Sequence, residues 1–234
     1  MSPDTLVADS FLVDHGRVLR LDAHVERFAR DAARTGFSEE RAAAGLVGLA
    51  LSVPSAGAWF PRIDLLADHT LETHLRPAPA RGGVVRLVTG EGDPRTQPAV
   101  KGPDLDRMIE LRRWAVARGA DEAVVTVGGL VCDGALSALA WWRDGCLFVP
   151  DPALTRVSSV TAQWLVETAE GEGVPVERVF ALPAEVAGAE VWVMSALHGI
   201  RPVVEWVDGP EVAHGARHHQ WQRRWLADRV PVQR

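Results

Sequence analysis

Two segments in the second half of the chain, 122–132 and 138–150, each consist of two short apolar runs joined by a turn pair, Gly-Gly in one and Asp-Gly in the other. An Asp-Gly pair between apolar runs is a strong short-range signal of a β-hairpin. Segments with helical periodicity precede and follow these hairpins, but helices and strands do not alternate as they do in a doubly wound sheet. The sequence therefore predicts a mixed α+β fold.

The first half of the chain has a similar mixture. Residues 5–21 are typical of two strands joined by a turn at 14–16. Asp22 suits an N-cap, and apolar residues at helical spacing follow it, so we expect a helix that ends before Gly36. A second helix is expected at 39–51, where alanine and leucine are frequent. Strands are expected at 59–66, 69–76 and 83–89.

The segment 91–99 is rich in turn residues and lacks apolar periodicity. We expect a linker there, between an N-terminal domain at 1–90 and a C-terminal domain at 100–234. Asp104 can cap a helix just beyond the linker. Further helices are expected at 161–169, 183–187 and 215–228, and further strands at 176–180, 190–195 and 202–207.

Composition argues against several functions. The net charge of −6 disfavours a broad nucleic-acid surface, which would be basic. No apolar run approaches the roughly 18 residues of a membrane span, and the first residues lack the pattern of a signal peptide. Cys132 and Cys146 are too few for a disulfide framework and too far apart for a metal knuckle. We therefore expect a cytoplasmic protein with no metal and no nucleic-acid or membrane partner.

Lys101 is the only lysine in the chain, whereas the total of 25 lysines and arginines leaves 24 arginines. An arginine side chain keeps its proton in a protein and cannot act as a nucleophile. A lysine can, and its amine can form an imine with a carbonyl group. A codon bias towards arginine is the alternative explanation, so the neighbourhood of Lys101 has to decide between the two.

Four other places could act together with this amine. His24 and Arg27 lie three residues apart on an expected helix and so share a face, where the arginine could bind a phosphate. Asp133 lies among apolar neighbours and needs a partner to stay charged, which a protonated ring nitrogen would be. The segments 158–161, before a helix, and 195–203, after a strand, could offer backbone N–H groups to an anion.

Each of these places also has an ordinary interpretation: a surface arginine, a turn aspartate, a helix cap and a plain loop. Taken together they supply an amine for an imine, a carboxylate for a pyridinium and several groups for a phosphate. Those are the requirements of pyridoxal 5'-phosphate, a cofactor that acts as an electron sink while the protein holds and tunes it.

The order of these motifs resembles the fold type IV pyridoxal phosphate enzymes, which include branched-chain aminotransferases, D-amino acid aminotransferases and aminodeoxychorismate lyase. The resemblance runs from about Ala8 to Gly209. It is carried by ADSFLVDHGRVLRLDAHVERF, by Lys101 before a helix, by GADEAVVTVGGLVCDGALSALAWWRDGCLFVP, by SSVT before a helix and by SALHGIRPVVEWVDG. The family fold implies a small N-terminal α/β domain, a larger C-terminal barrel-like domain that carries the lysine, a cofactor between them, and a homodimer.

The resemblance also implies a role for individual residues. Lys101 matches the Schiff-base lysine, and Arg27 matches the arginine that binds the cofactor phosphate. Asp133 stands where the family usually has a glutamate beside the ring nitrogen. The remaining phosphate contacts match two turns, Val160 with Thr161 and Ser195 with Ala196.

Some positions depart from the family pattern. Asp133 is one methylene shorter than the usual glutamate, which leaves its reach to the ring nitrogen open. Ala138 follows Ser137 where an asparagine is common, and Ser159 replaces a common glycine. The tyrosine that branched-chain enzymes carry shortly after the lysine is missing, which disfavours a branched-chain specialist.

Three functions remain open at this point. The first is a class IV aminotransferase that moves an amino group between an amino acid and a keto acid. The second is a lyase of the aminodeoxychorismate type, which eliminates pyruvate to give 4-aminobenzoate, with Arg201 or Arg107 holding substrate carboxylates. The third, suggested by the departures, is a degenerate homologue that binds a ligand without turnover.

Overall fold

The computed structural model of the protein describes residues 5–232. Contacts group the chain into two compact units, which are described separately below. The first unit comprises Met1–Arg81, Val100–Leu105 and Trp225–Arg234, and the second comprises Gly82–Ala99 and Asp106–Arg224. The domain boundaries expected from the sequence stay a prediction. Lys101 is grouped with the first unit because its segment packs on the first strand.

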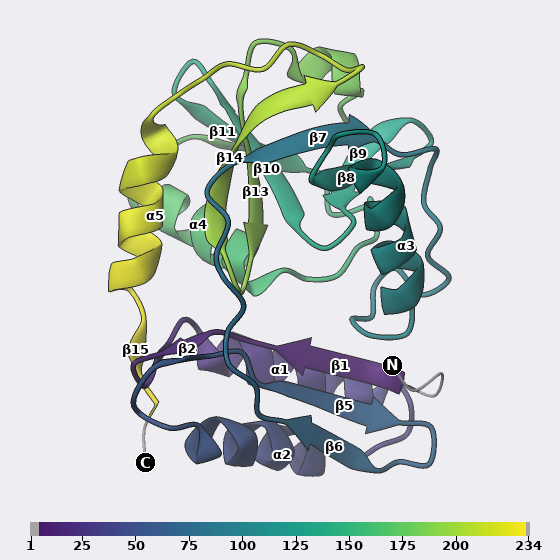
Figure 1. Cartoon of the computed structure of the whole chain (residues 1–234), viewed down its shortest axis with the longest axis vertical. Helices are drawn as coiled ribbons and strands as arrows, with labels where there is room; N and C mark the ends of the chain where they lie inside the picture. The colour runs from purple at the N-terminus through teal and green to yellow at the C-terminus, as the bar shows by residue number, and fades with distance from the viewer. Residues whose placement is uncertain (1–4, 233–234) are drawn as a thin grey trace. The chain divides into compact units, whose positions relative to one another are not determined.

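The first unit contains two small sheets and two helices (Figure 1). One antiparallel sheet has the order β1-β5-β6, and the other has the order β15-β3-β2-β4. The strands are β1 (Thr5–Ser10), β2 (Val13–Asp14), β3 (Arg17–Val18), β4 (Ala58–Trp59), β5 (Arg62–Leu66), β6 (Leu71–His74) and β15 (Val230–Pro231). The helices are α1 (Leu21–Ala33), which packs on β1, and α2 (Glu39–Ser52), which packs on α1, β5 and β6.

The start of α1 differs from the expectation. Its N-cap is Arg20, in the left-handed conformation with φ 49°, and not Asp22. Asp22 lies inside the first turn instead, where its carboxylate faces the positive end of the helix dipole. The helix α2 begins as a capped helix should, because the Ser38 hydroxyl accepts a hydrogen bond from the Arg41 N–H.

The second unit is built on one mixed sheet of eight strands in the order β12-β11-β10-β13-β14-β7-β8-β9. Its strands are β7 (Val85–Thr89), β8 (Glu122–Val127), β9 (Leu130–Gly134), β10 (Ala138–Arg143), β11 (Cys146–Pro150), β12 (Val176–Val179), β13 (Glu190–Ser195) and β14 (Gly199–Val207). The strand β7 runs parallel to both of its neighbours, and most other pairs are antiparallel. The helices are α3 (Leu105–Val116), α4 (Val160–Gly171), the 3-10 helix η1 (Pro183–Val186) and α5 (Arg217–Ala227). The curled sheet agrees with the barrel-like domain expected from the sequence (Figure 1).

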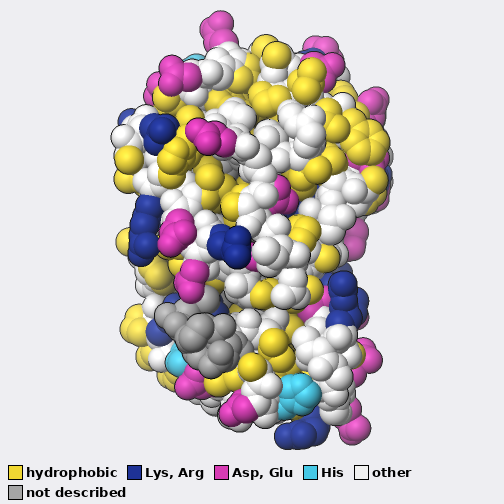
Figure 2. Space-filling model, turned by 90° about the vertical axis from the view of Figure 1, so that its right-hand side faces the viewer, with side chains coloured by type: hydrophobic (Ala, Val, Ile, Leu, Met, Phe, Trp, Pro, Cys, Tyr) yellow, Lys and Arg dark blue, Asp and Glu magenta, His cyan; other side chains and the backbone are white. Residues whose placement is uncertain are grey.

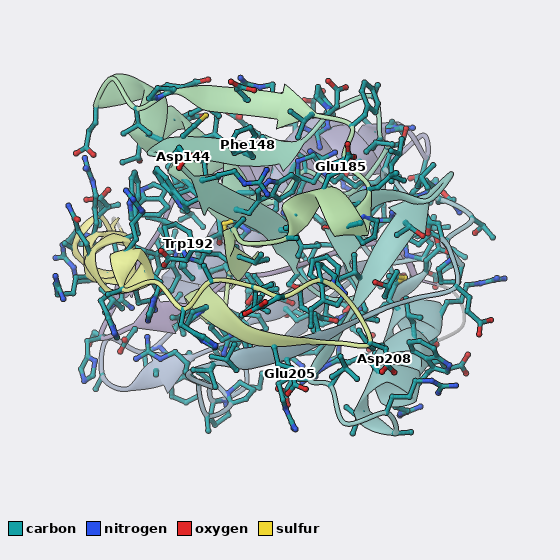
Figure 3. The ribbon with its side chains drawn as sticks, turned by 90° about the horizontal axis from the view of Figure 1, so that it is seen from above. Asp144, Phe148, Glu185, Trp192, Glu205 and Asp208 are labelled. Carbon is teal, nitrogen blue, oxygen red and sulfur yellow. The ribbon has the colours of Figure 1, made fainter. Side chains whose placement is uncertain are left out.

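Both hairpins predicted from the turn pairs are formed. In the turn between β10 and β11, Asp144 and Gly145 have φ values of 50° and 81°. In the turn between β8 and β9, Gly128 and Gly129 have φ values of 59° and 83°. Two consecutive positive φ angles are what a type I′ hairpin turn requires, which explains why Asp-Gly and Gly-Gly stand there. Asp144 is labelled in Figure 3.

The consecutive residues Trp141 and Trp142 point to opposite faces of β10, as alternation along a strand requires. Trp141 stacks on Phe148 of β11, with ring centroids 6.3 Å apart. Trp142 packs on Trp192 of β13, at 5.4 Å, and on Trp221 of α5, at 5.7 Å. Both rings are buried. Trp221 also packs on Trp164 of α4, with ring centroids 6.2 Å apart.

Within residues 5–232, no helix is both long enough and apolar enough to cross a bilayer. The face of the molecule in Figure 2 carries acidic, basic and apolar side chains interspersed with one another.

Candidate active site

The single lysine is fixed against β1 by its backbone. The Ala8 N–H donates a hydrogen bond to the Lys101 carbonyl oxygen over 2.7 Å. Gly102 has a φ of 132°, and a Cβ at that position would lie 2.7 Å from the Ala8 nitrogen and 3.0 Å from the Val7 carbonyl carbon. Only glycine allows this close approach. Lys101 therefore has a defined place beside the strand, with its side chain half-buried.

Asp9, which follows Ala8 in β1, carries a buried carboxylate. It is fully buried and accepts two hydrogen bonds on Oδ2 from Arg27, from Nε at 2.8 Å and from Nη2 at 2.6 Å. The Nδ1 atom of His24 lies 2.9 Å from Oδ1. Arg27 and His24 share a face of α1, as their spacing predicted. Both are buried, and both are held by Asp9.

The charges around Asp9 keep its carboxyl group ionised. Burial opposes ionisation of Asp9, but the charges of Arg27, His24 and Lys101 and the hydrogen bond from His24 hold its pKa well below the usual range. Burial lowers the pKa of His24, against the attraction of Asp9. Asp9 is thus a permanent anion at neutral pH, and the charge of Lys101 is among those that stabilise it.

The sequence reasoning did not single out Asp9. A signal was present, because this carboxylate stands in the middle of the apolar run TLVADSFLV. A charged group in a buried strand requires a partner.

In the second unit, Asp133 is a buried carboxylate on β9. Its Oδ2 accepts a hydrogen bond from Arg95 Nη1 over 3.2 Å, and its Oδ1 accepts one from the Gly134 N–H over 3.2 Å. Burial raises the pKa of Asp133 to about 7, although the charges of Arg95 and Arg156 work against this rise. The sequence predicted that this carboxylate needs a partner, and the protein itself supplies one from the segment that we expected to be a linker.

A second buried carboxylate, Glu122, lies close to Asp133. It accepts a hydrogen bond from Ser137 Oγ over 3.1 Å and two longer ones from the Ala123 and Leu136 N–H groups. Burial raises its pKa, and its negative charge also contributes to the raised pKa of Asp133. The sequence reasoning did not name Glu122, which follows directly on a loop and carries no spacing signal.

The two turns that we expected to contact a phosphate both belong to the second unit. Ser159 is the N-cap of α4 and accepts from the Ala162 N–H over 3.3 Å, so that Val160 and Thr161 form the first turn, where helices present backbone donors. Val160 and Thr161 are both buried. Ser195 ends β13, and its hydroxyl accepts from the His198 N–H over 3.2 Å. Ser195 and Ala196 are half-buried.

The structure therefore gathers the expected residues into two sets. Lys101 and Arg27 belong to the first unit, where Asp9 joins them. Asp133 and the two turns, Val160 with Thr161 and Ser195 with Ala196, belong to the second unit. Their roles in binding a cofactor stay predictions. Within residues 5–232, no group of three or more histidine, cysteine or acidic side chains is placed to hold a metal ion.

Several solved structures share this fold. A branched-chain aminotransferase from Thermoproteus uzoniensis is 18% identical, with 99% of this chain and 91% of that chain covered and a TM-score of 0.83. A putative 4-amino-4-deoxychorismate lyase from Legionella pneumophila is 15% identical, with 97% and 94% covered and a TM-score of 0.81. The PLP-bound form of a hypothetical aminotransferase from Mycobacterium tuberculosis is 19% identical, with 97% and 89% covered and a TM-score of 0.80. The expected fold type IV architecture is confirmed.

The sequence itself matches a known family over most of its length. The family profile described as "Amino-transferase class IV" matches residues 6–206. The chain therefore belongs to the class IV aminotransferase family. A search of curated proteins finds no match.

Proposed function

We propose that the protein is a pyridoxal phosphate-dependent aminotransferase that moves an amino group between an amino acid and a keto acid. The observation that carries the proposal is the fixed position of the only lysine: its carbonyl is bonded to β1, and its charge acts on the buried Asp9. The family membership and the PLP-bound relative support the same cofactor.

The donor groups present fit pyridoxal phosphate. A basic ring nitrogen requires a buried carboxylate, and Asp133 is one. A phosphate requires helix N-terminal or turn N–H groups, which the residues Val160 with Thr161 and Ser195 with Ala196 would supply. Arg27 would have to bind the phosphate while it pairs with Asp9, because its Nε and Nη2 atoms already donate to that carboxylate. We propose that Arg27 contributes its charge to the phosphate while Asp9 fixes its orientation.

When bound, the cofactor supplies an electron sink for the substrate carbanion. The Lys101 amine would hold the cofactor, and the same amine, when free, would accept the proton from the substrate α-carbon. Asp133 would hold a proton at the ring nitrogen. Asp9 would balance the charge of Arg27 and hold the His24 ring in place, so that the lysine meets a fixed local charge.

The proposal is tested by amino transfer with a panel of amino donors and either 2-oxoglutarate or pyruvate as acceptor. Replacing Lys101→Ala should abolish transfer and the cofactor absorbance of the purified protein. Lys101→Arg is the matched control, since it keeps the positive charge but cannot form the covalent bond. It should be as inactive as the alanine variant. Amino transfer by either variant at the wild-type rate would exclude the proposed role.

The lyase activity is the second candidate. Arg201 favours it, because its Nε atom is buried without a hydrogen-bond partner among the described residues. Burial also lowers the pKa of this arginine, so a substrate carboxylate would be a favourable partner. An assay for 4-aminobenzoate and pyruvate release, run beside the transfer assay, separates the two activities. Arg201→Gln should then raise KM for the carboxylate-bearing substrate more than it lowers kcat.

We also propose a homodimer in the cytoplasm, as the family resemblance implies. Light scattering of the purified protein tests the oligomeric state directly. A monomer at micromolar concentration would argue against it.

A further inference from the structure

Asp133 is held on both of its carboxylate oxygens. Oδ1 accepts from the Gly134 N–H, and Oδ2 accepts from Arg95 Nη1. The side chains of Asp133 and Arg95 are only 10% and 4% exposed. An ion pair as buried as this one orients its members strongly, and removing one member leaves an uncompensated charge.

Arg95 is itself locked in place by a second carboxylate. Its Nε donates to Asp93 Oδ1 over 2.8 Å, and its Nη2 donates to Asp93 Oδ2 over 2.9 Å. The Arg95 backbone N–H donates to the same Asp93 Oδ1 over 3.0 Å. This bidentate fork fixes the guanidinium plane, so the remaining donor, Nη1, points at Asp133 from one direction.

One guanidinium therefore serves two carboxylates. Burial works against the charge of Arg95, but the hydrogen bonds to Asp93 and the charges of Asp93 and Asp133 raise its pKa above the ordinary value, so it is a permanent cation. Because Asp93 neutralises much of this cation, Asp133 receives only part of its charge.

We propose that Arg95 is a positioning residue for Asp133: it fixes the direction of this carboxylate and sets how much negative charge the carboxylate offers to the ring nitrogen of the cofactor. The inference rests on the proposed function for its catalytic meaning, but the coupling of Asp93, Arg95 and Asp133 is a property of the protein alone. Arg95 lies in the segment 91–99, so this segment serves the site and is more than a connection.

Other charged groups also act on Asp133 and have to be kept constant in a test. The charge of Arg156 lowers its pKa, and the charge of Glu122 raises it. Cys132 is adjacent in sequence, and Arg95 Nη2 lies 3.6 Å from its Sγ. Substitutions at Asp93 or Arg95 leave Arg156 and Glu122 in place, whereas Arg95→Gln also removes the contact of Arg95 with Cys132.

Substitutions at Arg95 and at Asp93 should shift the pKa of Asp133 in opposite directions. Arg95→Gln removes the cation, so the pKa of Asp133 should rise by about one unit or more. Asp93→Asn leaves the cation in place and removes its competitor, so the pKa of Asp133 should fall, again by about one unit. A general loosening of the structure would shift both variants in the same direction.

The measurement is a ¹³C NMR titration of aspartate carboxyl groups in the full-length protein without cofactor, with the Asp133 signal assigned from Asp133→Asn. Arg86→Gln is the matched control, because Arg86 belongs to the same unit, is half-exposed and pairs with Asp121. It should leave the Asp133 signal unchanged. If Arg95→Gln does not fold, the test uses Asp93→Asn together with Arg95→Lys. The lysine variant keeps the positive charge but loses the bidentate hydrogen bonds to Asp93.

A cofactor titration then connects the charges to function. Arg95→Gln should weaken pyridoxal phosphate binding about tenfold or more and shift the pH profile of kcat in the direction of the NMR shift. If Asp133 titrates unchanged in both variants, or shifts in one direction in both, the inference about Arg95 is wrong even when the protein binds the cofactor. If the NMR shifts are opposite but wild-type protein binds no cofactor, the proposed function fails and the charge coupling stands.

Discussion

Asp9 and Asp133 are both buried aspartates paired with arginine, yet they have opposite electrostatic character. Asp9 faces two groups from α1, Arg27 and His24, with the charge of Lys101 in addition, and its pKa is held below the usual range. Asp133 shares its arginine with a second carboxylate, and burial raises its pKa to about 7. Burial raises the pKa of both carboxylates, so the difference between them comes from the cations and carboxylates that surround each one.

The comparison separates two tasks. Asp9 is suited to a structural anion that keeps one charge at every physiological pH. Asp133 is suited to a group whose charge responds to a new neighbour, such as a protonated ring nitrogen.

The largest effect is expected for Asp9→Ala. This change removes the carboxylate that the buried Arg27 and His24 contact, which should lower the free energy of unfolding by about 3–5 kcal/mol. Urea unfolding followed by tryptophan fluorescence measures it. Asp22→Ala is the matched control, because this exposed aspartate of α1 forms an ion pair with Arg20 at the surface, and its loss should cost less than about 1 kcal/mol. Equal losses in the two variants would contradict the structural role of Asp9.

The second prediction concerns the pH dependence of Asp133→Asn. Since the pKa of Asp133 is raised from 3.8 to about 7, the folded protein holds a proton that the unfolded chain releases. Ionisation of Asp133 therefore costs stability as the pH rises through this window. Relative to wild type, Asp133→Asn should be more stable at pH 8 than at pH 5 by roughly 2 kcal/mol. If the free energies of unfolding of the two proteins differ by the same amount at pH 5 and pH 8, Asp133 does not have a raised pKa and the contrast with Asp9 is wrong.

The smallest effect is expected at His24. Burial is the main cause of its lowered pKa, and the charge of Arg27 contributes to it. Arg27→Gln should therefore raise the pKa of His24, by about one unit or less, as the ring takes over the pairing with Asp9. NMR of the imidazole protons follows this titration. An unchanged or lowered pKa would show that the two groups do not share the Asp9 charge.

Local patterns in the sequence were sufficient for much of the fold. The turn pairs at 128–129 and 144–145 predicted two hairpins correctly, because their positive φ angles demand those residues. The spacing of His24 and Arg27 placed both on one helix face. The cap of α1 was wrong, because Arg20 adopts a left-handed conformation that no propensity favours.

The partners of the buried charges could not be predicted. Arg95 reaches Asp133 across 38 residues of sequence, and Asp9 reaches Arg27 across 18. Such pairings depend on how strands and segments pack in three dimensions, and the spacing of residues carries no trace of them. The contact of Trp142 with Trp221 of α5 could not be predicted either, because the two residues lie far apart in the sequence.

The most direct test of the account is to find where the cofactor attaches. The purified protein is loaded with pyridoxal phosphate, reduced with borohydride, digested, and mapped by mass spectrometry. Because the chain has a single lysine, we expect the reduced adduct on the peptide that contains Lys101, and no adduct on that peptide in Lys101→Arg protein. An adduct confined to the N-terminal amine, or no adduct on a protein that still transfers amino groups, would contradict it.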